Sequence, residues 1–169
     1  MDIFVINIEH SNCISSDLLS NFGCKIFSNI NKQRIHRFSY LMLDRILKDV
    51  YKLDERTVIL NEKGKPILKN GKKSFSISHC NKYIVLAFSD YKCGIDIEEV
   101  KERNYKKISD RMGFNSSSLK EFYLDWTQYE AEYKLGTKAR SIFKFGLPNY
   151  FITAVSESKD EIFNTYYNS

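Results

Sequence analysis

Two acidic residues alternate with isoleucines in the segment CGIDIEEV, which runs from Cys93 to Val100. In a strand, residues i and i+2 point to the same side, so Asp96 and Glu98 would share one side and the isoleucines the other. Two carboxylates this close repel each other unless water or a cation separates them. Acids that alternate along a strand most often form only a solvated face, so the pair alone does not indicate a site.

A second candidate group is the segment WTQYEAEYK, which runs from Trp126 to Lys134. In a helix, Trp126, Glu130 and Lys134 follow one another at intervals of four residues and therefore lie on one face. Glutamate four residues before lysine is also an ordinary surface ion pair, which contributes only about 0.3–0.5 kcal/mol. His79, at the end of SISH, and Lys65, in the turn-forming KGKP, have equally ordinary structural explanations.

The elements that must position these residues are two long helices and several strands. Apolar residues recur at helical spacing through 31–51, and a second helix is predicted over 115–136, with a serine of the 116–118 run as its cap and Gly136 at its end. A short capped helix is expected at 15–22 and a polar connection at 60–73. Strands are expected at five places: 2–10, 74–79, 82–89, 93–100 and 150–158. The three central strands predict an antiparallel meander, and the whole order predicts an α+β fold.

Composition limits the class of protein. Of the 169 residues, 43% are hydrophobic and 14% aromatic, enough for a substantial core in one domain or in two small halves. No G-x-G-x-x-G or Walker sequence occurs among the seven glycines, so no glycine-rich phosphate loop is expected. Four cysteines without C-x-x-C or zinc spacing favour free thiols in a reducing compartment. No signal-like or membrane-spanning segment is found, which predicts a cytoplasmic protein without membrane contact.

The net charge of +5 is spread along the chain rather than gathered in blocks. Such a surface fits a polyanionic ligand or an acidic protein partner. Nucleic acid remains possible on charge alone. However, the chain has no arginine-rich helix, no RNP-like aromatic strand and no zinc spacing, so no nucleic-acid partner is expected.

Taken together and in order, the motifs GKP, ISH, GIDIE and W-x-x-x-E-x-x-x-K resemble those of the 4′-phosphopantetheinyl transferases, in particular the surfactin-type branch. The match spans about residues 32–134. The resemblance implies a monomer of two similar halves, 1–99 and 100–169, each with a mostly antiparallel sheet packed against a long helix. The second half is shortened, since the chain ends soon after the strand expected at 150–158.

The activity implied by this resemblance is transfer of phosphopantetheine from coenzyme A to a serine of an apo acyl or peptidyl carrier protein, with release of adenosine 3′,5′-bisphosphate. Asp96, Glu98 and Glu130 would bind Mg²⁺, which prefers oxygen ligands and would neutralise the pyrophosphate. Glu130 would also deprotonate the serine. Lys134 would balance the charge of the transferring phosphate.

Other residues would bind the coenzyme A nucleotide by the same resemblance. Ser78 and His79 would contact it, His79 through the 3′-phosphate, and Lys65 would touch the nucleotide or its phosphates. A basic residue of the first helix joins them, for which Arg34 and Arg37 both qualify, with Arg37 preferred and Lys32 a weaker option. The chain departs from the family at Tyr129, where lysine is usual. An alternative is therefore a degenerate, non-catalytic module that binds coenzyme A or a carrier protein.

Overall fold

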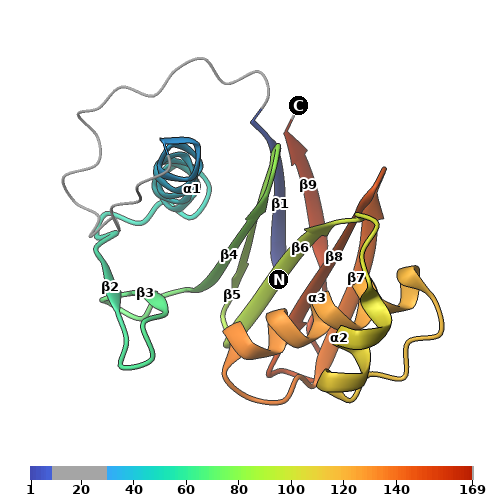
Figure 1. Cartoon of the computed structure of the whole chain (residues 1–169). Helices are drawn as coiled ribbons and strands as arrows, with labels where there is room; N and C mark the ends of the chain where they lie inside the picture. Colours follow the sequence, from blue (N-terminus) through green and yellow to red (C-terminus); the bar gives the residue numbers. More distant parts are fainter. Residues whose placement is uncertain (9–29, 169) are drawn as a thin grey trace.

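The computed structural model describes residues 1–8 and 30–168, which form three helices and nine strands. The helix expected at 15–22, together with Cys13 and Cys24, lies outside the described residues. The elements in chain order (Figure 1) are β1 (Asp2–Asn7), α1 (Ile30–Asp49), β2 (Val58–Leu60), β3 (Pro66–Leu68), β4 (Ser74–Cys80), β5 (Tyr83–Ser89), β6 (Cys93–Glu99), α2 (Tyr105–Met112), α3 (Leu119–Leu135), β7 (Ser141–Leu147), β8 (Tyr150–Ser156) and β9 (Asn164–Asn168).

Two sheets make up the body of the protein. The first has the strand order β4-β5-β1-β9, in which β1 pairs antiparallel with β5 and parallel with β9. The second has the order β6-β8-β7, and both of its pairings are antiparallel. A short hairpin of β2 and β3 forms separately. The expected α+β class with largely antiparallel sheets is therefore confirmed.

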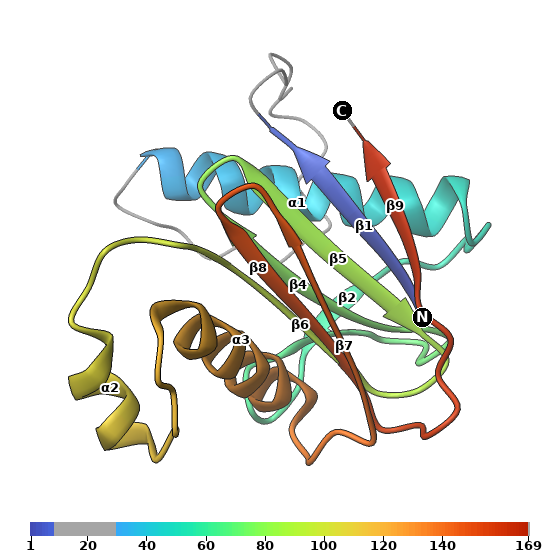
Figure 2. The ribbon, with the colours of Figure 1, turned by 90° about the vertical axis from the view of Figure 1, so that its right-hand side faces the viewer.

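Apolar side chains fill the space on both faces of the first sheet. On one face, α1 packs through a cluster that includes Leu43, Leu47 and Phe88. The other face meets the second sheet, where Ile3 and Ile95 belong to one buried cluster. The remaining face of the second sheet is covered by α3 (Figure 2). The layers therefore follow the order helix, sheet, sheet, helix.

Strands from the two expected halves are interleaved. β6, at the end of segment 1–99, pairs with β8, and β9, at the end of segment 100–169, pairs with β1. The first and last strands consequently lie side by side (Figure 1). The position 99/100 falls in the connection from β6 to α2 and does not coincide with a boundary between the sheets.

The three-stranded meander expected over 74–100 is wrong in its third strand. β4 and β5 do pair antiparallel, but β6 leaves their sheet and pairs with β8. The reason is that β4 and β1 already occupy both edges of β5, so no backbone groups remain there for a third neighbour. The predicted alternation within β6 is confirmed, because Ile95 and Ile97 both point into the core between the sheets.

Several short elements do not emerge from the sequence pattern. The connection expected at 60–73 contains β3, and the sequence pattern predicts neither its partner β2 nor α2, β7 and β9. β7 does carry an alternating signal, since Ile142 and Lys144 are exposed while Phe143 and Phe145 pack against the core. Its glycine and lysine weaken that signal in the sequence alone.

The ends of α3 agree with the expected signals. The hydroxyl of Ser118 accepts a hydrogen bond of 3.2 Å from the backbone N–H of Glu121, and Gly136 ends the helix in the left-handed conformation with φ of 82°. These caps fix the span over which α3 presents its side chains to β6. Among residues 1–8 and 30–168, no helix combines the length and apolar character that crossing a bilayer requires.

Candidate active site

Gly94 allows α3 to lie directly on β6. A Cβ atom at Gly94 would stand 2.0 Å from the carbonyl oxygen of Ala131 and 3.0 Å from the backbone nitrogen of Leu135. Asp96 and Glu98 follow at intervals of two residues, so their side chains leave β6 on the side that faces α3. The close approach of the two backbones therefore brings the two strand acids to the helix.

Asp96 is the centre of this contact and is only 5% exposed. Its Oδ1 atom accepts hydrogen bonds of 2.7 Å from the hydroxyl of Ser78 and of 2.7 Å from the ammonium group of Lys134. Lys134 also donates to the backbone oxygen of Ile95, at 3.1 Å. The other carboxylate oxygen, Oδ2, is buried and has no hydrogen-bond partner. Such an atom is costly to bury unless a donor or cation reaches it.

Glu98 and Glu130 lie in the field of Asp96. Burial is the main cause that raises the pKa of Glu98, and the charges of Asp96 and, more weakly, Glu130 raise it further. An opposing hydrogen bond of 3.3 Å from the indole N–H of Trp126 to Glu98 Oε1 lowers that pKa. Burial also raises the pKa of Glu130, followed by the charge of Asp96, while Lys134 lowers it. The charge of Asp96 therefore disfavours the ionisation of both Glu98 and Glu130.

These residues fit a hard divalent cation. In the described part of the chain, no three His, Cys, Asp or Glu side chains already converge as a metal cage. Mg²⁺ does not require one, because it commonly takes one or two protein carboxylates and completes its shell with water and phosphate oxygens. The ligand set is entirely carboxylate, and Asp96 Oδ2 is buried and unsatisfied. Asp96, with Glu98 and Glu130 beside it, would hold such an ion.

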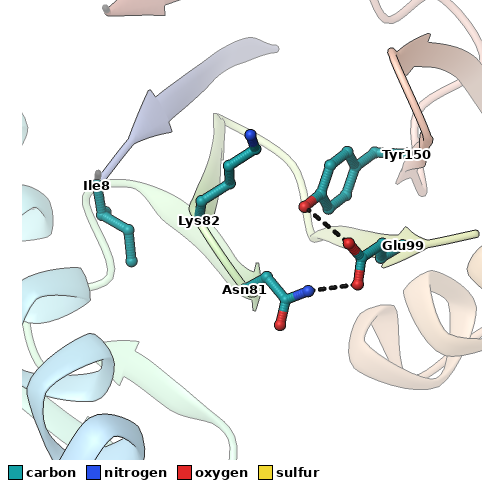
Figure 3. Close-up of a pocket in the computed structure, with 5 residues that line it drawn as sticks. All are labelled: Ile8, Asn81, Lys82, Glu99 and Tyr150. Atoms are coloured by element: carbon teal, nitrogen blue, oxygen red, sulfur yellow. Dashed lines mark hydrogen bonds between the residues drawn. The ribbon is translucent and has the colours of Figure 1, made fainter. Parts of the chain in front are cut away.

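Glu99, the next acid of the same strand, has a different environment. Its carboxylate accepts hydrogen bonds from Asn81 and, at 3.3 Å, from Tyr150 (Figure 3). The Lys101 ammonium lies 2.7 Å from the same carboxylate. The bond from Lys101 is the main cause that lowers the pKa of Glu99. Asn81, Glu99 and Tyr150 border a separate hollow of about 430 Å³ that Lys82 also lines. Glu99 is thus already paired, and it is not a candidate ligand.

Side chains rather than a strand cover the outer edge of β6. The N–H of Ile95 donates to the hydroxyl of Ser76 at 3.1 Å, and the ammonium group of Lys65 donates to the carbonyl of Cys93 at 2.9 Å. Lys134 binds the next outward carbonyl, that of Ile95. Burial is the main cause that lowers the pKa of Lys65. The thiol of Cys93 raises this pKa, whereas the charge of Lys134 lowers it further. Two of the predicted lysines are therefore brought together on this edge.

An open groove of about 1410 Å³ runs along this edge. It lies between the β2–β3 hairpin, β4 and the C-terminal end of α3. Five lysines line it: Lys63, Lys65, Lys92, Lys134 and Lys138. Glu62 and Glu132 are the acids in its wall, so cationic groups predominate. The groove therefore offers a positively charged surface beside the three acids.

The remaining predicted contacts are less closely gathered. His79 is exposed at the end of β4, yet its ring is crowded enough that burial lowers its pKa, followed by the charges of Lys134 and His36. Arg34 and Arg37 are exposed on α1, and neither belongs to the described residues that line the groove. The structure gives no preference between them.

Tyr129 belongs to an aromatic cluster along α3 that also includes Trp126 and Phe122. Its ring centroid lies 6.0 Å from that of Phe114 and 6.2 Å from that of Trp126. Trp126 in turn stacks on Phe122 at 6.0 Å. Trp126 is therefore both a packing residue and the hydrogen-bond donor to Glu98. The ring of Tyr129 packs against this residue.

Two residues of the site are missed by sequence reasoning. Ser76 gives no signal, because a serine in a strand has many uses. Gly94 does give one, since glycine inside a strand often marks a close approach of another backbone.

No protein-family model and no curated protein matches the chain in a comparison with known proteins.

Proposed function

We propose that the protein transfers the 4′-phosphopantetheine arm of coenzyme A to a serine of an apo acyl or peptidyl carrier protein, with Mg²⁺ as cofactor. The observation that carries this proposal is the group formed by Asp96, Glu98, Glu130 and Lys134. The acids come from a strand and a distant helix that touch at Gly94, and one buried oxygen of Asp96 has no partner. The sequence resemblance names the same four residues.

In this proposal Asp96, Glu98 and Glu130 hold Mg²⁺, which would neutralise the negative charge of the pyrophosphate. Glu130 takes the proton of the carrier serine while the serine oxygen attacks the phosphorus that bears pantetheine. The bond from that phosphorus to the bridging oxygen breaks, and adenosine 3′,5′-bisphosphate leaves. Burial and the charge of Asp96 raise the pKa of Glu130, which makes its carboxylate a stronger base than that of an ordinary glutamate.

Lys134 stabilises the phosphate charge, and the groove beside it receives the coenzyme A nucleotide. Lys65 and His79 contact the nucleotide and its phosphates, with Arg37 or Arg34 of α1 as a further cation. The five lysines of the groove favour a ligand with several negative charges. The Ser78 hydroxyl already donates to Asp96, which favours a role in holding that carboxylate over direct contact with coenzyme A.

The finer fold expectation belongs to the same proposal. Each sheet carries one long helix, which supports two related halves with the second one reduced. The activity would take place in the cytoplasm and in a monomer, because coenzyme A and apo carrier proteins are found there and both acidic elements belong to one chain. Size measurement in solution tests the last point.

The direct test is incubation with coenzyme A, Mg²⁺ and a panel of apo carrier proteins from fatty-acid, polyketide and peptide synthesis. Mass spectrometry of the intact carrier should show the added phosphopantetheine arm. The addition should disappear when the carrier serine is replaced by alanine. Glu130→Gln is the matched inactive enzyme. The proposal fails if no carrier gains the arm under conditions where a known transferase modifies all of them.

A non-catalytic binding module is the second candidate, and two observations favour it. Tyr129 stands where lysine is usual. The ammonium group of Lys134 is hydrogen-bonded to Asp96, so it is not fully available to a phosphate in the groove. Such a module would bind coenzyme A or an apo carrier without transfer. Calorimetric binding of coenzyme A together with an unmodified carrier in the assay above would favour this alternative.

A further inference from the structure

The pairing of Lys134 with Asp96 puts an ammonium group where a cation is needed. Asp96 Oδ1 and the carbonyl oxygen of Ile95 both accept from Lys134 Nζ, at 2.7 and 3.1 Å. A carboxylate oxygen and a backbone carbonyl are also the ligand types that Mg²⁺ and Mn²⁺ prefer. Lys134 therefore satisfies, in part, the same oxygen atoms that a divalent ion would seek.

This pairing leaves the negative charge of the site incompletely balanced. Asp96 Oδ2 has no partner although it is buried. Glu98 and Glu130 add two further carboxylates, whereas Lys134 is the ammonium that contacts this group directly. One positive charge among three acids leaves an excess of negative charge. A divalent ion would balance it better than an ammonium group.

Lys134 is partly exposed and borders the groove. Its side chain is 27% exposed, whereas that of Asp96 is 7% exposed. It extends from the last turn of α3, two residues before Gly136, which ends the helix in the left-handed conformation. The side chain lines the groove with Lys65 and Lys138. Rotation about its own flexible bonds would carry the ammonium from Asp96 into the groove without moving the helix.

We propose that Lys134 is an internal counter-ion that holds Asp96 while no divalent cation is bound, and that it leaves Asp96 for the groove when one binds. The inference rests on the cation of the proposed function but not on transfer itself. It implies competition, because a divalent ion on the Asp96 carboxylate would repel the ammonium group of Lys134 held on the same carboxylate. Binding of the ion therefore releases a positive charge toward any phosphate in the groove.

The test is titration with Mn²⁺, with free and bound ion distinguished by electron paramagnetic resonance. Lys134→Met keeps the aliphatic stem and removes the charge. It should bind Mn²⁺ roughly fivefold more tightly than the unaltered protein, the scale expected of a partly exposed ion pair. Lys120→Met, on the exposed first turn of the same helix, carries the same change in net charge and should leave the affinity within a factor of two. Asp96→Asn should abolish binding in either background.

Thermal unfolding is a second measurement, which keeps the inference testable if Lys134→Met is less stable than the unaltered protein. The midpoint of thermal unfolding should fall in Lys134→Met without metal and rise more on Mn²⁺ addition than in the unaltered protein, because the ion replaces the lost charge. Equal or weaker Mn²⁺ affinity in Lys134→Met, together with an equal or smaller rise in the midpoint, overturns the inference.

The outcomes separate this inference from the proposed function. Tighter Mn²⁺ binding in Lys134→Met without any carrier modification by the unaltered protein keeps the counter-ion role and removes the transferase. Carrier modification by the unaltered protein, with no gain in Mn²⁺ affinity in Lys134→Met, keeps the transferase activity and removes the counter-ion role. Absence of Mn²⁺ binding in every variant removes both the counter-ion role and the cation of the proposed function.

Discussion

Gly94 lies beneath the backbone of Ala131, so closely that a Cβ on Gly94 would stand 2.0 Å from the Ala131 carbonyl oxygen. No side chain can occupy that space unless the helix shifts. The contact joins β6 to α3 two residues before Asp96 and one residue after Glu130. It therefore sets the distance between the strand acids and the helix acid.

Gly94→Ala should displace α3 and destabilise the protein by about 3 kcal/mol, the upper range for overpacked cores. Carrier modification and Mn²⁺ binding should be lost together. Urea unfolding measures the first effect and titration the second. Because the clash is with a backbone atom, the additional change Ala131→Gly should not restore stability. Full rescue by that second change would show that the contact is between side chains.

Asp96→Asn should abolish transfer and leave Lys134 without its carboxylate. The cost to stability should be about 1–3 kcal/mol, below the range for a fully buried ion pair, because Lys134 is partly exposed. Ser78→Ala removes a neutral donor from the same oxygen and should cost about 1 kcal/mol while keeping measurable transfer. Carrier modification and urea unfolding of both variants check this. Wild-type turnover in Asp96→Asn contradicts the cation site.

Glu130→Gln should make the protein more stable at neutral pH in the absence of divalent ions. Burial is the main cause that raises the pKa of Glu130 in the folded protein. Below the ordinary pKa of glutamate, the carboxyl is protonated in both the folded and the unfolded state and costs no stability. The folded state loses stability as pH rises through the raised value, because the carboxyl must then ionise in an unfavourable environment. Glutamine removes that loss, and the advantage of the variant should vanish near pH 4.

Glu121 on the same helix is the control, because hydrogen bonds from Ser117 lower its pKa. Its stabilising effect is present above the ordinary pKa and disappears as pH falls through the lowered value. Glu121→Gln should therefore reduce stability at neutral pH, with the opposite sign to Glu130→Gln. Urea unfolding at pH 4 and pH 7 decides, and the same sign in both variants contradicts the electrostatic assignment.

His79 should make coenzyme A binding depend on pH. Its pKa is lowered, so the ring is mostly neutral at pH 7 and gains its charge only as pH falls through that lowered value. If His79 contacts the 3′-phosphate, affinity should increase on acidification, and His79→Ala should weaken binding roughly three- to tenfold and flatten this dependence. Calorimetry with dephospho-coenzyme A, which lacks the 3′-phosphate, is the control. An equal effect of the substitution on both ligands removes the assignment.

Tyr129→Lys introduces the residue that is usual before the helix glutamate in the 4′-phosphopantetheinyl transferases, which the motifs of this chain resemble. Tyr129 is 43% exposed, so the substitution should cost less than about 1 kcal/mol, mainly through lost ring contacts with Phe114 and Trp126. Transfer should increase if the lysine contacts phosphate. Tyr133→Lys, at a position 75% exposed on the same helix, is the charge control. Equal stimulation by both variants would indicate a general charge effect.

Local patterns in the sequence predict those elements whose cause is local. The apolar repeat of α1, the serine cap and glycine end of α3, and the alternation of Ile95 and Ile97 in β6 all depend on neighbours within a few residues. The partner of β6 does not. It depends on β5 having both edges occupied and on β8, which lies over fifty residues later, being available.

For the candidate site, the sequence by itself determined which residues carry charge and that Asp96 shares a strand face with Glu98. Only the tertiary structure decided that α3 lies on that face, that Lys134 occupies one oxygen of Asp96 and that the other oxygen is buried without a partner. The physical reason is range. Strand and helix periodicity act over a few residues, whereas the packing of Gly94 against Ala131 and the electrostatics of the buried acids depend on groups more than thirty residues apart.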